Sequence, residues 1–231
     1  MTLFKFEQPP AVEVPIVGSK SGYPVRRVFC VGRNYEAHIR EMGASVREPP
    51  FFFTKFPCAI VPSGACLDYP PGTRNFQYEG ELVLALAATA FEISAEQART
   101  VIFGYAAGLD MTRRDLQFAA RDKGRPWDTG KNFEQSAPVG DIMPAARLGE
   151  LRRAPLELAV NGEIAQRADI AEMIWSAEEI IAHLSALYHL DVGDLIFTGT
   201  PAGVGPVMAG DRIDLRIGEL PQLRVTVAEN E

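Results

Sequence analysis

Residues 77–87 form the segment that most constrains what this chain can fold into. The second half of the segment, residues 82–87, is apolar and is typical of a buried strand. The first half carries Glu79 and Glu81. Because successive side chains of a strand point to opposite faces, these two carboxylates point to the same face, about 6–7 Å apart along the strand. They repel each other unless a cation lies between them, so the pair indicates either a site for a hard divalent cation or a strand start exposed to water.

Asp110 is the first residue that shifts the balance between these two interpretations. On the glutamate pair alone, exposure to water is favoured, because most Glu side chains in folded proteins are exposed. Asp110 follows the apolar segment 101–109 at the start of a predicted helix, where an acid is costly unless it caps the helix or binds a cation. Thr112 already offers a cap, with Asp115 as its capping-box partner. Asp110 is therefore available to a cation, and an all-oxygen ligand set suits Mg²⁺, with Mn²⁺ and Ca²⁺ as alternatives.

The helix predicted after Asp110, which runs to about Arg121, carries polar side chains on one face. Arg114, Gln117 and Arg121 follow at helical spacing, which places them side by side. Next to a cation, Arg114 and Gln117 could donate hydrogen bonds to a substrate oxygen; without one, they form a solvated helix face. Lys131 lies in a polar, glycine-bearing segment and by itself is indistinguishable from a surface lysine.

His38 and Glu41 lie one helical turn apart on a short helix that we predict over residues 35–42, with Asn34 as its N-cap. At this spacing the carboxylate can hold the imidazole as a general base for water. The alternative is a surface histidine beside a helical glutamate.

A glycine-rich loop, residues 199–205, directly follows a predicted strand. It lacks the Gly-Lys-Ser/Thr ending of a phosphate-binding loop and the helix that follows a dinucleotide fingerprint. Its backbone N–H groups and the Thr200 hydroxyl could still bind an anion, as an alternative to a plain turn.

Strands outnumber helices along the chain. Residues 1–24 include a stretch rich in Pro, Gly and Ser and are predicted to be an extended lead-in; residues 25–231 are predicted to form a single catalytic domain. The predicted strands are not separated by regular crossover helices, which favours a β-dominated α+β fold. We predict strands over residues 25–31, 51–55, 59–62, 79–87, 101–109, 195–198, 212–217 and 223–227, a hairpin around Asn161-Gly162, and helices over 94–99, 112–121 and 176–188.

Composition excludes several classes of protein. No run of about 18 apolar residues occurs, which argues against a membrane span, and the N-terminus lacks the apolar segment of a signal peptide. With neither segment we expect a cytoplasmic protein. The three cysteines, an odd number without zinc-site spacing, are expected to be reduced thiols. The net charge of −7 argues against nucleic-acid binding, but it allows a small anionic substrate, which a local basic site or a metal can capture.

Taken in order, these segments resemble the fumarylacetoacetate hydrolase family over roughly residues 25–228. Each motif alone is weak, and the ordered set is specific. The matching pieces are Gly32-Arg33-Asn34-Tyr35 with His38 and Glu41, Tyr78-Glu79-Gly80-Glu81-Leu82, Asp110-Met111-Thr112-Arg113-Arg114-Asp115, Lys131, and Gly199-Thr200-Pro201-Ala202-Gly203-Val204-Gly205.

The resemblance implies a mixed β-sandwich roll, usually homodimeric. It also implies Mg²⁺ or Mn²⁺ on Glu79, Glu81 and Asp110. His38, oriented by Glu41, would be the base for water, and Lys131 would hold the leaving pyruvate enolate. Arg114, Gln117 and Thr200 would position the rest of the substrate.

Residues 23–35, 49–53 and 110–117 are similar to the branch of this family that cleaves fumarylpyruvate during gentisate degradation. Leu109 departs from the Asn that many members carry at this position. The implied reaction is hydrolysis of the C–C bond of an acylpyruvate, with fumarylpyruvate giving fumarate and pyruvate. Oxaloacetate decarboxylation, isomerisation or hydration of a 2-oxo acid, and metal-dependent binding of an oxo acid without turnover remain alternatives.

Overall fold

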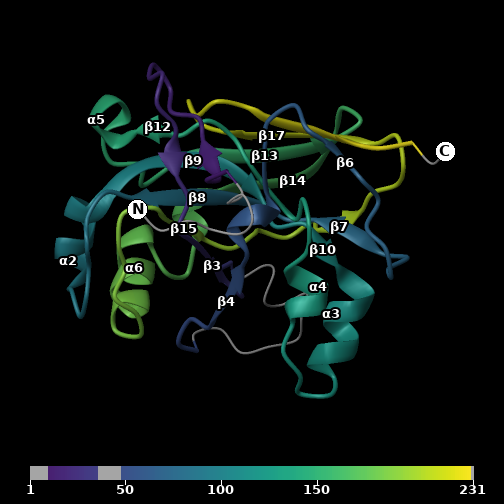
Figure 1. Cartoon of the computed structure of the whole chain (residues 1–231), viewed down its shortest axis with the longest axis horizontal. Coiled ribbons are helices and arrows are strands. Elements are labelled where there is room, and N and C mark those ends of the chain that lie inside the picture. Colours follow the sequence, from purple (N-terminus) through teal and green to yellow (C-terminus); the bar gives the residue numbers. More distant parts are fainter. Residues whose placement is uncertain (1–9, 36–47, 230–231) are drawn as a thin grey trace, which may run out of the picture.

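The computed structural model describes residues 10–35 and 48–229 of the 231-residue chain. His38 and Glu41, with nearly all of the helix predicted around them, lie outside these ranges. Within the described residues, strands dominate and curl into layers around a buried centre (Figure 1). The prediction of a β-dominated α+β fold is therefore confirmed.

A large mixed sheet forms the centre of the molecule. Its strands follow the order β4-β3-β15-β8-β9-β11-β5, and β12 pairs separately with β9. β8 is antiparallel to both of its neighbours, β15 and β9. The bounds of these strands are β3 Arg27–Val31, β4 Phe52–Lys55, β5 Ile60–Pro62, β8 Gly80–Leu86, β9 Ile102–Leu109, β11 Ala137–Val139, β12 Met143–Pro144 and β15 Asp194–Phe197.

A second sheet, with strand order β14-β13-β17-β18-β6, lies across β8 and β9 in Figure 1. Its β13–β14 hairpin turns at Asn161 and Gly162, whose φ angles of 53° and 91° are those of the tight turn that an Asn-Gly pair predicts. The bounds of its strands are β6 Cys66–Leu67, β13 Pro155–Val160, β14 Glu163–Asp169, β17 Arg212–Ile217 and β18 Leu223–Val227.

Two small sheets and several short helices complete the described fold. The sheet β10-β7-β16 consists of Thr112–Arg113, Phe76–Tyr78 and Gly205–Pro206, and β1 Glu13–Val14 pairs with β2 Tyr23–Pro24. The α-helices are α2 Ala95–Ala98, α3 Arg114–Arg121, α4 Asp128–Lys131, α5 Ala145–Leu148 and α6 Ala177–Ser185. The 3-10 helices are η1 Pro57–Ala59, η2 Arg99–Val101 and η3 Ile170–Glu172.

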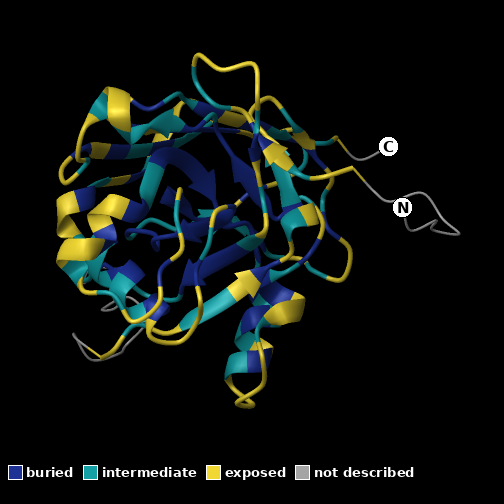
Figure 2. Cartoon of the chain, turned by 60° about the vertical axis from the view of Figure 1, so that its left-hand side comes forward, coloured by how far each residue is buried: buried dark blue, intermediate teal, exposed yellow. Residues whose placement is uncertain are grey.

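β8 is buried along its whole length, and its side chains alternate between two hydrophobic clusters. Leu82 and Leu84 pack into the larger cluster, which holds side chains of the second sheet and of α6. Val83 and Ala85 pack into the other cluster, together with side chains of β3 and β15. Figure 2 shows these central strands as buried. Because Glu81 precedes Val83 by two residues, its carboxylate points to the Val83 face.

Helix caps agree with the sequence at two sites and differ at one. Ser94, the expected cap of the predicted helix 94–99, forms a capping box with Gln97 in α2, and Ser176 forms the capping box with Glu179 that its spacing predicts for α6. The Thr112–Asp115 box is wrong, although α3 spans the predicted residues: Arg113 is the N-cap residue and makes no side-chain cap. The reason is that the Thr112 hydroxyl bonds to the Asp110 carbonyl and to Lys131, and the Asp115 carboxylate accepts hydrogen bonds from Thr73 and Arg74.

Candidate metal centre

Glu79, Glu81 and Asp110 meet at one end of the β8–β9 pair. The ladder joins Gly80 to Leu109, and the Asp110 N–H donates to the Glu79 carbonyl at 2.9 Å, so Glu79 and Asp110 lie opposite each other. One carboxylate oxygen from each of the three acids lies within 4.8 Å of the others. All three side chains are buried, which overturns the interpretation of a solvent-exposed strand start.

Lys131 lies between two of these carboxylates. Its Nζ is 2.7 Å from Glu79 Oε2 and 2.7 Å from Asp110 Oδ2, and it donates to the Thr112 hydroxyl at 2.8 Å. Burial by itself would lower the pKa of Lys131, but the charges of Asp110 and Glu79 outweigh burial and the pKa is raised. The ammonium group therefore stays charged in a site from which water is excluded.

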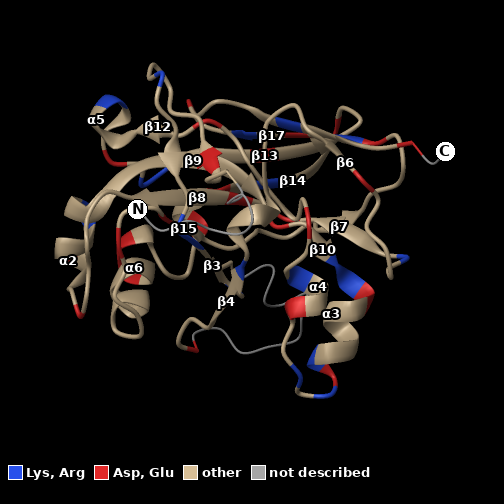
Figure 3. Ribbon diagram, viewed as in Figure 1, with Lys and Arg blue, Asp and Glu red and all other residues tan. Residues whose placement is uncertain are grey.

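Two further buried cations complete the arrangement. Lys55 Nζ is 2.9 Å from Asp110 Oδ1 and donates to the backbone carbonyls of Met111 and Lys131. Arg114 contacts Glu79 Oε1 and donates to Gln117 Oε1 at 2.6 Å. Figure 3 shows Lys and Arg residues on α3 and α4, beside β10.

Glu81 differs from the other two acids because it makes no ion pair within the described residues. Its Oε2 accepts a hydrogen bond from the Gly199 N–H at 2.7 Å. Burial raises the pKa of Glu81 well above its ordinary value, and the neighbouring charges of Asp110 and Glu79 raise it further. A bound cation would favour the ionised form of this carboxyl.

The donor set fits a hard divalent cation. Three carboxylates offer oxygen ligands, which Mg²⁺ and Mn²⁺ prefer. The Lys131 ammonium group already bridges Glu79 and Asp110, which demonstrates that this point between the two carboxylates accommodates positive charge. Asp110 Oδ1 is buried without a hydrogen bond, although it is ion-paired with Lys55. Within the described residues, this is the group of acids that can hold a metal ion.

The structure brings most of the predicted site residues together. Arg114, Gln117 and Lys131 are buried around the triad. Thr200 is buried nearby, where its hydroxyl donates to the Gly80 carbonyl at 3.0 Å and accepts a hydrogen bond from Gln166 at 2.8 Å. In contrast, Arg121 pairs with the exposed Asp122 and takes no part in the cluster.

Lys55 is the site residue that the sequence analysis missed. It ends an aromatic strand, two residues after Phe53, so it shares a face with a partly buried ring. A lysine at that position in an apolar strand is a signal that could have identified it, because an unpaired charge is not tolerated on a buried face.

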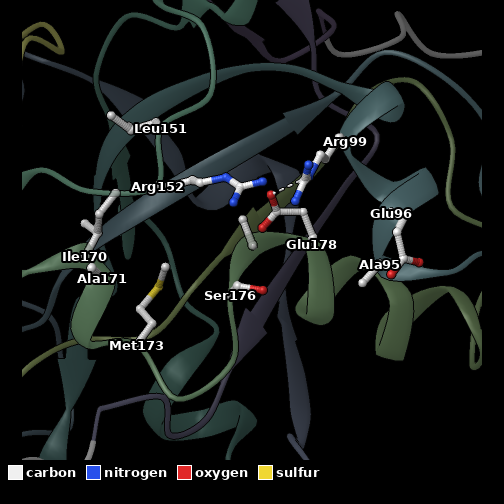
Figure 4. Close-up of a pocket in the computed structure, with 11 residues that line it drawn as sticks. Ala95, Glu96, Arg99, Leu151, Arg152, Ile170, Ala171, Met173, Ser176 and Glu178 are labelled. Atoms are coloured by element: carbon white, nitrogen blue, oxygen red, sulfur yellow. Dashed lines mark hydrogen bonds and ion pairs between the residues drawn. The ribbon is translucent and has the colours of Figure 1, made fainter.

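A pocket of about 280 Å³ lies elsewhere, between α2, α6 and η3 (Figure 4). Arg99 and Arg152 extend toward it. Arg99 pairs with Glu178 at 3.2 Å and Arg152 with Glu150 at 2.8 Å, so neither arginine offers uncompensated charge to a ligand. None of the triad residues lines this pocket.

Among the described residues, no helix combines the length and apolar character needed to cross a membrane.

Comparison with known proteins gives consistent matches over nearly the whole chain. Residues 27–228 match the family described as fumarylacetoacetate hydrolase, C-terminal. A fumarylpyruvate hydrolase from a Ralstonia species is 50% identical over 184 residues, which is 80% of this chain and 95% of that protein. An oxaloacetate tautomerase from Escherichia coli is 39% identical over 197 residues, which is 85% of this chain and 90% of that protein.

Solved structures agree with the sequence matches. The crystal structure of fumarylpyruvate hydrolase from Pseudomonas aeruginosa, in complex with Mn²⁺ and pyruvate, matches with a TM-score of 0.96 and 48% identity. The match covers 99% of this chain and 100% of that one.

Proposed function

This chain belongs to the fumarylacetoacetate hydrolase family, and on that basis we propose that it hydrolyses the carbon–carbon bond of an acylpyruvate. The substrate that we propose is fumarylpyruvate, which gives fumarate and pyruvate, as in the breakdown of aromatic compounds. The observation that carries the proposal is the buried cluster of three carboxylates and three cations, in a chain 50% identical to a fumarylpyruvate hydrolase.

Glu79, Glu81 and Asp110 are the residues that would hold the metal, which we propose to be Mg²⁺ or Mn²⁺. A divalent cation bound there supplies Lewis-acid polarisation of the 2-oxo acid end of the substrate.

Charge balance at the site supports an anionic substrate. The three carboxylates are matched by the buried cations Lys55, Lys131 and Arg114, so the side chains sum to zero charge when all are ionised. A divalent cation added to this set leaves an excess of two positive charges in a low-dielectric environment. A ligand with two negative charges at its pyruvate end, one on the carboxylate and one on the enolate oxygen, restores neutrality.

Lys131, Arg114 and Gln117 would hold the pyruvate end while the bond breaks. Lys131 and Arg114 already contact carboxylate oxygens of the triad, so both can offer N–H groups to substrate oxygens at the same point. Such donors stabilise negative charge as it develops on the leaving enolate. Thr200 would help to position the rest of the substrate from the side of Gly80, to whose carbonyl its hydroxyl donates.

We propose that His38, oriented by Glu41, is the general base. His38 would take a proton from water, the resulting hydroxide would attack the acyl carbonyl, and cleavage of the C–C bond would release pyruvate enolate, which then takes that proton. The described residue Asn34 packs against Gly199, whose N–H binds Glu81. The four residues from Asn34 to His38 can span up to about 14 Å, a length that allows His38 to reach the site.

The test follows loss of fumarylpyruvate absorbance by the purified protein, before and after treatment with EDTA and after addition of Mn²⁺. We expect turnover to stop with EDTA and return with Mn²⁺; turnover unaffected by chelation contradicts the metal role. His38→Ala should lower kcat by about 10²–10⁴-fold. A near-native rate in that variant would remove His38 from the reaction.

A second candidate activity acts on oxaloacetate, because the 39% identical relative is an oxaloacetate tautomerase. Tautomerisation or decarboxylation of oxaloacetate needs no activated water. We therefore expect His38→Ala to spare decarboxylation and Glu81→Ala to abolish it. Native protein that turns over oxaloacetate faster than fumarylpyruvate would favour this candidate.

We also propose that the enzyme is a cytoplasmic homodimer, on the basis of the family resemblance. Light scattering of the purified protein should give about twice the chain mass of 25.3 kDa, and a mass equal to one chain would contradict the dimer.

A further inference from the structure

An aromatic wall, formed by Phe51, Phe53 and Trp127, leads away from the metal centre. Phe53 lies on the same face of β4 as Lys55, and its ring centroid is 5.2 Å from Lys131 Nζ. The Trp127 ring is 6.0 Å from that of Phe53 and 5.3 Å from that of Phe51. The wall therefore begins at the buried cations and ends at Phe51, a residue that is 40% exposed.

Gly32 allows the outer end of the wall to form. Its N–H donates to the Phe51 carbonyl at 3.0 Å, and a Cβ at this position would lie 2.0 Å from the Phe51 ring. The ring can therefore lie over this residue only because it has no side chain. The next residue, Arg33, places its guanidinium carbon 5.9 Å from the centre of the same ring.

Arg33 is a cation without a protein partner among the described residues. Its Nε is buried and makes no hydrogen bond, and it forms no ion pair there. This contrasts with Lys55, Lys131 and Arg114, each of which is paired with an acid of the triad. Buried polar groups in native proteins are almost always hydrogen-bonded, so an unpaired guanidinium N–H beside a binding site indicates a place for a ligand.

Two neighbours connect Arg33 to the metal centre. Asn34 packs against Gly199, with its Cβ 2.8 Å from the position that a Gly199 Cβ would take, and the Gly199 N–H binds Glu81. The Tyr35 hydroxyl is buried and has no hydrogen-bond partner within the described residues. The segment that carries Arg33 therefore adjoins both the Glu81 side of the metal centre and the outer end of the aromatic wall.

We propose that Arg33 binds a second carboxylate, at the acyl end of the substrate, and so selects acylpyruvates that carry a negative charge at both ends. This inference rests on the function proposed above. The pyruvate end lies at the metal centre, the conjugated acyl chain runs along the aromatic wall, and the guanidinium pairs with the distal carboxylate. Arg suits this role because its planar N–H groups match a carboxylate in two places. A substrate that lacks the distal carboxylate leaves the guanidinium unpaired, which weakens its binding.

The first test compares fumarylpyruvate with acetylpyruvate, in which a methyl group replaces the carboxyvinyl group and so removes the distal carboxylate. We expect Arg33→Met to lower the ratio of kcat/KM for fumarylpyruvate to that for acetylpyruvate by about 10- to 100-fold, the loss expected for one charge-assisted pair. Arg33→Lys keeps the charge but not the planar fork and should give an intermediate ratio. A ratio within about twofold of native for Arg33→Met would overturn the inference.

Arg113→Met is a matched control. Arg113 also has a buried Nε without a hydrogen bond, and its guanidinium carbon lies 4.2 Å from the centre of the Phe133 ring. Its guanidinium stacks on Phe133, which is not part of the aromatic wall, so it does not border the path proposed for the acyl chain. The substrate ratio of this variant should stay within about twofold of native.

The second test uses the native protein, so it does not depend on a variant that folds. Fumarate carries two carboxylates, whereas crotonate has a methyl group in place of one of them. Fumarate should inhibit fumarylpyruvate turnover at an at least tenfold lower concentration than crotonate, and equal inhibition overturns the inference. Absence of turnover of both acylpyruvates by native protein is a different result, which defeats the proposed function itself.

Discussion

At the scale of single residues, Glu81 determines how the metal centre responds to pH. The other two acids of the triad are paired with Lys55, Lys131 or Arg114, whereas Glu81 receives only the Gly199 N–H within the described residues. Burial, together with the charges of Asp110 and Glu79, holds its pKa well above the ordinary value. The metal-free site therefore favours a protonated Glu81, and a cation must displace that proton.

We expect stabilisation by Mn²⁺ to increase with pH. A carboxyl whose folded pKa is raised contributes stability below its unfolded pKa, and this stability is lost as the pH rises through the folded pKa. A cation at Glu81 removes this loss because it favours the ionised form. The difference in Tm between Mn²⁺-loaded and EDTA-treated protein should widen from pH 5 to pH 8. In Glu81→Gln, which cannot ionise, the widening should largely disappear; an equal widening in both proteins would contradict this role.

Lys55 should matter most when the metal is absent. Its side chain is fully buried and pairs with Asp110 at 2.9 Å, so Lys55→Met leaves that carboxylate short of one counter-charge. Removal of one partner of a buried pair costs about 3–5 kcal/mol. We expect a loss of this size in urea unfolding with EDTA and a smaller loss with saturating Mn²⁺, which replaces part of the missing charge.

Lys123→Met is the control for Lys55→Met because Lys123 is an exposed lysine. The unfolding free energy of the Lys123→Met variant should differ from that of the native protein by less than about 0.5 kcal/mol. Equal losses for Lys55→Met with EDTA and with Mn²⁺ would mean that Lys55 acts through packing alone.

At the scale of elements, β8 links the hydrophobic core to the metal centre. Its apolar residues pack on both faces of the large sheet, and the strand leads directly from Glu79 and Glu81. The two carboxylates are held in place because the register of the strand is fixed by burial on both faces. The short strands β7 and β10 then place Thr112 and the start of α3 beside the triad.

Leu84→Ala should destabilise the whole domain. Leu84 is fully buried in the larger cluster, so its truncation should cost about 2–5 kcal/mol in urea unfolding. Leu187→Ala, at a leucine that is 65% exposed, should change the unfolding free energy by less than about 0.5 kcal/mol. Comparable losses in the two variants would contradict the central position of β8.

At the scale of the whole molecule, the site is assembled from distant parts of the chain. Lys55 comes from β4, Glu81 from β8, Glu79 and Asp110 from the positions just before β8 and just after β9, and Lys131 from α4. The glycine-rich loop after β15 closes over Glu81, 118 positions away in the sequence. These connections depend on the strand order of the large sheet, in which β8 lies between β15 and β9.

The sequence by itself determined the local features of this protein. The Asn161-Gly162 hairpin, the Ser94 cap, the Ser176 capping box and the β-dominated fold follow from short-range chemistry, in which neighbouring residues interact regardless of the rest of the chain. The spacing of Glu79 and Glu81 indicated a shared face for the same reason. The position of Asp110, at the end of an apolar strand, was enough to add a third acid to the predicted cation site.

Only the tertiary structure decided which charges neutralise the triad. Lys131 looks like an ordinary lysine in the sequence, Thr112 looks like a helix cap, and Lys55 is marked only by its place in an apolar strand. Their roles arise because the strand order brings β4, β10 and α4 to the carboxylates, where exclusion of water makes pairing of charges obligatory. Sequence spacing cannot reveal such pairs, because the distance between their charges is fixed by packing across the sheet and not by position along the chain.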